Sequence, residues 1–284
     1  MVGSPLQPKN LREFLSGMHF FLTQKGFEGK VGGERIVFTK DGLMAVTTNN
    51  KHLAIRIFNV VSALALLEGI PSQTIRESET GQGQLNPDFE IMGWSMNIST
   101  PRTMLLRERF GERMMFSPRT AVVEDKLSKV VRRANRILSH PDKVDELTFW
   151  LESNTHMQDS EYAQSFTISW IIVERNLSNV WKAFLNEKNV EGNREDKLVS
   201  PGIWSIDYVI EALNLAGVIP EKDYKTLMDL KNKRNGFVHR GRRITKDDSV
   251  QCLNLATEIM RHDLEGLIDF DNEDRESSAI SIPS

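Results

Sequence analysis

The chain has 284 residues, 39% hydrophobic and 26% charged, which is ordinary for a globular protein of one large or two modest domains. A formal net charge of −3 argues against general electrostatic binding of nucleic acid, so contacts of that kind must come from local basic patches. A single cysteine, Cys252, excludes an internal disulfide and a two-cysteine metal site, and we expect it to be a buried apolar group.

The amino-terminal segment lacks the apolar stretch of a signal peptide. The longest apolar run, at residues 57–67, falls well short of the roughly 20 residues that cross a bilayer. We therefore expect a soluble, cytoplasmic protein with no membrane partner.

The first third of the sequence mixes helix and strand signals. Residues 11–23 and 52–68 read as helices, and residues 72–88 as a polar loop. Two β-rich runs, 34–39 and 43–48, flank an Asp-Gly pair that favours a hairpin, and residues 89–97 read as a further strand. These patterns predict a small mixed α+β domain over residues 1–117, of unknown role.

From residue 118 onward the pattern is helical. Apolar stripes at helical spacing run through residues 123–138, 144–156 and 166–187. Ser205, Pro220 and a capping box at Thr245–Asp248 indicate three further helix starts. We expect an all-α bundle over residues 118–270, then a disordered acidic and polar tail over residues 271–284. A basic group in the first of these helices reads as its solvent-exposed face, comprising Lys126, Lys129, Arg132, Arg133 and Arg136.

The helix that starts at Pro220 changes character along its length. Its apolar face begins at Leu227 and Met228, but the same face then continues through Lys231 and through Arg234 or Asn235. Burying polar groups is costly unless they are paired. The pattern fits either a helix that emerges into solvent or a polar cleft.

Helical geometry sets how these polar residues relate to His239. Asn235 and His239 are four residues apart, about 40° around a helix, so they can touch. Arg234 and His239 are five apart, about 140°, and need not share a face. Spacing alone does not predict a catalytic site.

The run Arg234-Asn235-Gly-Phe-Val-His239 resembles the R-x(4–6)-H motif of HEPN domains in its RNxxxH form. Leucines before the motif, Arg240-Gly241 after it and a following long helix are similar as well. The Apea-like branch of the family comes closest, since its upstream apolar helix with one embedded acid resembles residues 166–174, which end at Glu174. The resemblance covers roughly residues 118–270.

This resemblance implies a compact helical bundle and a metal-independent endoribonuclease that uses no cofactor and acts as a homodimer. His239 would be the general acid or base for attack of a ribose 2′-hydroxyl on the adjacent phosphate, a role that suits imidazole at neutral pH. Arg234 would hold the phosphate and stabilise the developing charge, Asn235 would orient His239 or the phosphate, and Glu174 would hold Arg234. In family toxins that are silenced by nucleotidylation, a tyrosine follows the histidine by two residues; here that residue is Gly241, so this regulation is not supported.

The same segment is locally basic, and clusters of this kind attract phosphate backbones. The residues expected to bind RNA are Lys231, Lys233, Arg240, Arg242 and Arg243. The alternative is a solvated helix end, where cations are favoured by the helix dipole.

Three functions remain open. The first is a ribonuclease of a defence, toxin or RNA-processing type that acts on tRNA or another structured RNA. The second is a non-catalytic module that binds RNA or protein. The third is an oligomerising scaffold in which the motif only supports structure.

Overall fold

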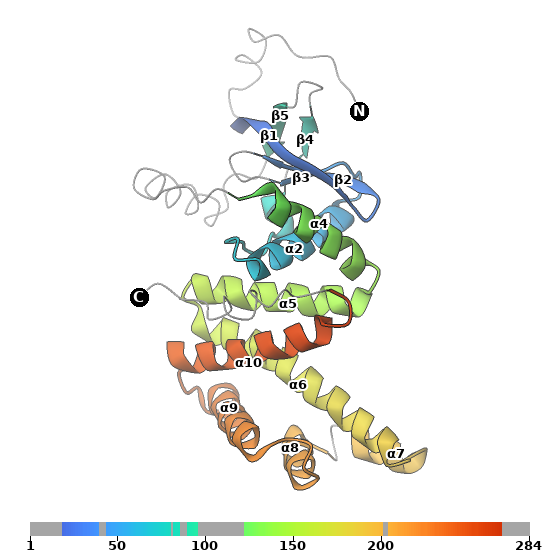
Figure 1. The fold of residues 1–284 in the computed structure, drawn as a ribbon. Coiled ribbons are helices and arrows are strands. Elements are labelled where there is room, and N and C mark those ends of the chain that lie inside the picture. Colours follow the sequence, from blue (N-terminus) through green and yellow to red (C-terminus); the bar gives the residue numbers. More distant parts are fainter. Residues whose placement is uncertain are drawn as a thin grey trace. The chain divides into compact units, whose positions relative to one another are not determined.

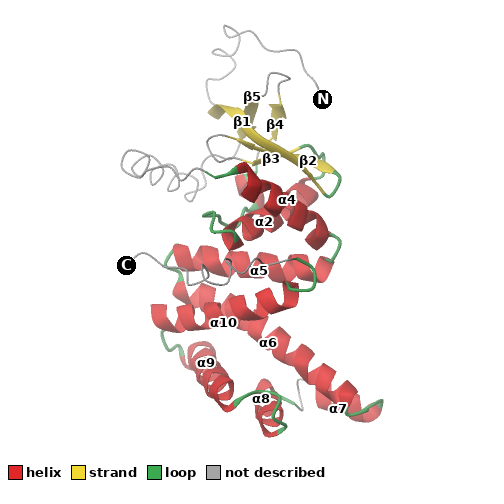
Figure 2. Ribbon diagram, viewed as in Figure 1, coloured by secondary structure: helices red, strands yellow, loops and turns green. Residues whose placement is uncertain are grey.

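The computed structural model describes residues 19–39, 44–80, 82–85, 90–95, 122–200 and 204–268, which fall into two compact units with the chain boundary after Val144. In the described residues, the first unit combines strands and helices, whereas the second is helical (Figure 2). The expected α+β class is confirmed. The elements of the first unit are β1 (His19–Val31), β2 (Glu34–Thr39), β3 (Met44–Val46), α2 (Lys51–Leu67), η1 (Glu77–Glu79), β4 (Gln82–Leu85), β5 (Glu90–Ser95) and α4 (Glu124–Leu138).

The five strands of the first unit form one antiparallel sheet in the order β3-β2-β1-β5-β4. The long strand β1 pairs with β5 through its first half and with β2 through its second half. Gly32 and Gly33 form the β1–β2 turn with φ of 60° and 84°, which suits a two-residue hairpin. β2 and β3 pair as the predicted hairpin, although its Asp-Gly turn lies outside the described residues.

Helix α4 packs against β1 through a close approach at Gly29, where an added Cβ would lie 2.9 Å from a Val131 methyl carbon. Asn135 of α4 accepts a hydrogen bond from Gly32 N at 2.9 Å and donates to Lys30 O at 2.7 Å, which fixes the hairpin. The apolar side of α4 therefore covers the sheet, as its sequence periodicity requires.

The opposite flank of α4 contacts α2 through buried charges rather than a solvated face. Arg133 donates to the buried Glu68 carboxylate, and Lys129 Nζ lies 3.2 Å from the same carboxylate. The prediction that these two cations belong to an exposed face is wrong, because spacing within one helix does not reveal an acid that follows a distant helix.

The second unit begins within α5 (Pro141–Gln158) and contains five further helices in the described residues (Figure 1). Its core lies where α6 and α10 pack together and α5 joins them, with Trp150 Nε1 donating to Thr257 Oγ1 at 2.8 Å. Cys252 is buried there as expected. The helices after α5 are α6 (Tyr162–Glu187), α7 (Asn193–Val199), α8 (Ile206–Leu215), α9 (Glu221–Arg240) and α10 (Lys246–Leu264).

Helix α8 links α6 to α9. The Trp204 ring, just before α8, stacks on Trp181 of α6 at a centroid distance of 5.0 Å. On the other side, Tyr224 of α9 donates to Glu211 of α8 at 2.8 Å. The contact between Tyr224 and Glu211 holds the first half of α9 against α8.

Several predicted boundaries differ from the structure. Residues 19–23 of the predicted helix 11–23 lie in β1, and the rest of that helix lies outside the described residues. The predicted loop 72–88 contains β4, whose Gln-Gly-Gln-Leu sequence carries no strand signal. The predicted domain boundary at residue 117 groups helix α4 with the helical part. In the structure, α4 packs in the first unit. The predicted tail, residues 271–284, lies outside the described residues. None of the helices in the described ranges combines the length and apolar character that crossing a membrane requires.

Candidate functional site

The carboxyl-terminal end of α9 carries the predicted motif. The helix stops because Gly241 adopts a left-handed conformation with φ of 62°. Gly241 N donates to Phe237 O, and Arg242 N donates to Gly236 O, both at 3.1 Å. These bonds satisfy two of the last carbonyls and turn the chain back along α9 before α10 begins at its capping box, which forms as predicted at Thr245 and Asp248.

Arg234, Asn235 and His239 all lie in regular helix, so their relative directions follow from helical geometry. Arg234 Nη1 donates to Asn235 Oδ1 at 3.1 Å, which brings these two side chains together. His239 is exposed, and the described part of the chain offers its imidazole no hydrogen-bond or ion-pair partner. Within one chain, Asn235 thus stands between Arg234 and His239 on the helix surface.

Glu174 lies half-buried on α6, one turn before the buried Leu177. No hydrogen bond or ion pair joins its carboxylate to Arg234, although both residues are described. The structure therefore does not bring the expected supporting acid onto the predicted arginine.

The predicted RNA-binding cluster separates into two sets. Lys231 is buried and its Nζ lies 3.0 Å from Asp207 of α8. Lys233 Nζ lies 2.7 Å from Asp229 and 2.8 Å from Asp248. These two lysines neutralise carboxylates and hold α9 against α8 and α10, which makes them structural cations.

The arginine set is different. The side chains of Arg240, Arg242 and Arg243 are exposed and have no hydrogen-bond or ion-pair partner within the described ranges. Their guanidinium groups are available to an anion. We call these three residues the arginine end of α9.

The pKa values of Lys233 and Asp248 reflect the pairing of these two side chains. Burial lowers the pKa of Lys233, but hydrogen bonds to Asp229 and Asp248 outweigh this effect, so the pKa lies above its ordinary value. Burial likewise raises the pKa of Asp248, but bonds from Lys233 and Thr245 bring it below its ordinary value. Both groups thus stay charged over a wide pH range.

A phosphate near this helix end meets two opposing fields. The last carbonyls of a helix carry partial negative charge, which disfavours an anion by about 0.3–1 kcal/mol. A hydrogen bond from a charged donor contributes about 1.5–3 kcal/mol. One well-placed guanidinium therefore outweighs the helix dipole, and the arginine end can attract a phosphate.

Two contacts at this site were not expected from the sequence. One is Asp207, the partner of Lys231, which precedes it by more than twenty residues and gives no local signal. The other is the Arg242 side chain, which covers the buried Gly236: an added Cβ would lie 3.1 Å from Arg242 Cδ and 3.7 Å from its Cβ. A glycine inside a helix is the one signal that pointed to a close approach here.

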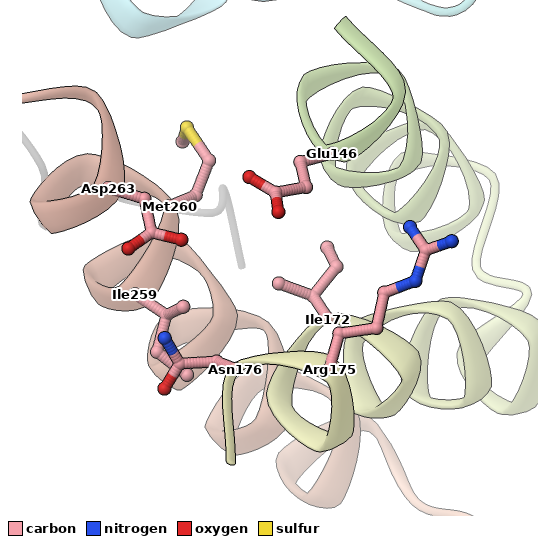
Figure 3. A pocket seen from close by; sticks show the side chains of 7 residues that line it. All are labelled: Glu146, Ile172, Arg175, Asn176, Ile259, Met260 and Asp263. Carbon is pink, nitrogen blue, oxygen red and sulfur yellow. The ribbon is translucent and has the colours of Figure 1, made fainter. Parts of the chain in front are cut away.

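A separate small pocket lies among α5, α6 and α10 (Figure 3). The Glu146 carboxylate points into the space between these helices, while Arg175 turns toward α5 and lies 5.2 Å over the Phe149 ring. The pocket has room for roughly one water molecule. None of the predicted site residues lines it; its lining consists of Glu146, Ile172, Arg175, Asn176, Ile259, Met260 and Asp263.

No group of three or more His, Cys, Asp or Glu side chains suited to a metal ion occurs in the part of the chain that the structure describes. Comparisons with protein-family models, with curated proteins and with solved structures find no match for this chain.

Proposed function

We propose that the second unit is a metal-independent endoribonuclease that acts on RNA in the cytoplasm through His239, Arg234 and Asn235. The observation that carries this proposal is the state of His239. Its imidazole is exposed and lacks a partner among the described residues, and it stands in the last turn of α9 beside the arginine end. A histidine that no structural contact uses is available for proton transfer near neutral pH.

In this mechanism a guanidinium holds the scissile phosphate while His239 takes or returns a proton. As general base, the imidazole removes the proton of the ribose 2′-hydroxyl, whose oxygen attacks phosphorus. The bond to the 5′-oxygen breaks, and that oxygen receives a proton from a second acid, for which a second copy of His239 in a homodimer is our candidate. The products carry a 2′,3′-cyclic phosphate and a 5′-hydroxyl.

The test is cleavage of a labelled mixed-sequence RNA and of a tRNA pool, with EDTA present. We expect wild type to leave 2′,3′-cyclic phosphate ends and His239→Ala to lose about 10²–10⁴-fold in rate. His262→Ala is the matched control, because His262 is an exposed histidine in the last turn of α10. An equal loss in both variants would contradict the catalytic role, and loss of cleavage in EDTA would contradict the metal-free mechanism.

A second candidate is an RNA-binding module without catalysis. It is favoured by one specific observation: Glu174 makes no hydrogen bond or ion pair with Arg234, so the arginine lacks the support that the nuclease reading expects. If the wild-type protein binds RNA but cleaves none of the RNAs tested, the binding module is established and the nuclease is overturned.

A further inference from the structure

Helical geometry places His239 between two flanks of α9. Asn235 lies about 40° to one side of it and Gly236 about 60° to the other. Side chains in a helix lean toward its amino terminus, so the imidazole covers the turn that contains Asn235 and Gly236. What stands on these two flanks therefore decides what meets a ligand bound to His239.

The Asn235 flank carries Arg234 through the hydrogen bond from its guanidinium to Asn235 Oδ1 at 3.1 Å. The Gly236 flank carries Arg242. Its Cβ, Cγ and Cδ are the three atoms nearest to the Cβ position that Gly236 lacks, at 3.7, 3.8 and 3.1 Å. Gly236 is buried, whereas Arg242 remains exposed.

The absence of a side chain at Gly236 gives the Arg242 stem its place on the helix. The chain reversal at Gly241 and the bond from Arg242 N to Gly236 O fix where that stem starts. The guanidinium at its end has no partner in the described residues. An arginine with an anchored stem and a free head is prepared to bind an anion without ordering a long side chain first.

We infer that Arg242, seated on Gly236, holds the RNA phosphate beside His239, so that the phosphate lies between Arg242 on one flank and Arg234 on the other. This inference rests on the proposed function and deepens it, since it makes Arg242 a catalytic residue rather than one of several surface cations. Gly236 is then a positioning residue, which acts only through Arg242.

The first experiment compares Arg242→Ala with Arg243→Ala, its neighbour of equal charge and similar exposure. Single-turnover RNA cleavage should fall about 100-fold in Arg242→Ala, as expected for loss of a donor to the developing charge, and only about threefold in Arg243→Ala. Equal losses in the two variants would overturn the inference while leaving the nuclease intact.

The second experiment tests the packing of the Arg242 stem on Gly236. Gly236→Ala keeps every charge and favours the helix, so its melting temperature should rise. The new methyl group displaces Arg242 by a few tenths of an ångström, and cleavage should fall roughly tenfold. In an Arg242→Ala background the same change should have no effect on rate, because the residue it displaces is gone. A tenfold loss that persists in that background would contradict the claim that Gly236 acts by positioning Arg242.

A measurement of RNA binding distinguishes failure of the nuclease proposal from failure of the proposed role of Arg242. A fully 2′-O-methylated RNA lacks the attacking hydroxyl, so its affinity reports phosphate contact without cleavage. If wild type binds this probe but cleaves no RNA, the nuclease fails, and a more than tenfold weaker binding by Arg242→Ala than by Arg243→Ala supports the arginine seat. If wild type neither binds nor cleaves, both proposals are overturned.

Discussion

The middle of α9 and the region around its carboxyl-terminal end use the same kind of residue for opposite purposes. In the middle of α9, Lys231 and Lys233 lie within 3.0 Å of carboxylates on α8, α9 and α10. At the arginine end, the guanidinium groups meet no such partner in the described chain. A continuous basic run in the sequence is thus two things in space: a set of structural ion pairs and a surface open to an anion. Four sets of measurements can test this difference between the paired and the unpaired cations.

The largest expected difference is in packing. Leu230 is fully buried, whereas Val238, two turns later, is 52% exposed. Leu230→Ala should lower the free energy of unfolding by about 2–5 kcal/mol, because it removes buried methyl groups and leaves a cavity. Val238→Ala should change it by less than about 0.5 kcal/mol. Urea unfolding measures both, and similar values for the two would show that the end of α9 is packed like its middle.

The second difference concerns the cations themselves. Lys231→Ala should cost about 1–2 kcal/mol of unfolding free energy, because a buried stem and the ion pair with Asp207 are lost. Lys222→Ala is the matched control on the same helix, since Lys222 is exposed and its side chain makes no hydrogen bond or ion pair within the described ranges. If both variants unfold at the same urea concentration, the pair with Asp207 does not stabilise the protein.

The third difference is in pH dependence. The folded pKa of Asp248 lies below its unfolded value, which is about 3.9. Its charge therefore stabilises the fold above that pH, and this contribution is lost as the pH falls through the folded pKa. Lys233 has a raised pKa, so its contribution is present below about 10.4 and is lost as the pH rises further.

We expect Asp248→Asn to be less stable than wild type by under about 1 kcal/mol at pH 7, and equal to it at low pH where both side chains are neutral. Asp247→Asn is the control, because Asp247 is exposed and without a partner in the described residues. Thermal melts from pH 7 down to pH 2 measure the difference. A gap that stays constant across this range would mean that the Asp248 charge is not what stabilises the helix start.

How far the sequence predicted these features depends on the range of the interaction that creates them. Capping at Thr245 and Asp248 involves neighbours in the chain, so it could be predicted and is found. The strand β4 has no apolar pattern and exists through its pairing with β5, which no local signal reveals. The same limit applies to charges: the pairing of Arg133 with Glu68, 65 residues away, is a matter of tertiary packing.

The candidate site divides along the same line. Helical spacing places Asn235 and His239 close together around α9, because residues four apart in a helix differ by only about 40°. It could not sort the basic run into paired and unpaired cations, since Asp207 and Asp248 lie on other helices. Nor could it place Arg242 on Gly236, because the chain reversal after Gly241 decides where that side chain lies.

The smallest effect tests the arginine end directly through salt. Each phosphate neutralised on single-stranded RNA releases counterions, so the logarithm of the binding constant falls with the logarithm of salt concentration by about 0.7 per contact. Arg243→Ala should therefore make this slope shallower by about 0.7 and leave urea unfolding unchanged within about 0.5 kcal/mol.

The opposite result is expected for the ion-paired residues Lys233 and Asp248. In the double variant Lys233→Gln with Asp248→Asn, one cation and one carboxylate disappear together, so local charge is conserved. Its slope should match wild type while its stability falls. Fluorescence anisotropy of a labelled single-stranded RNA across a salt series measures the slope, and a shallower slope in the double variant would mean that Lys233 reaches the RNA in spite of its two carboxylate partners.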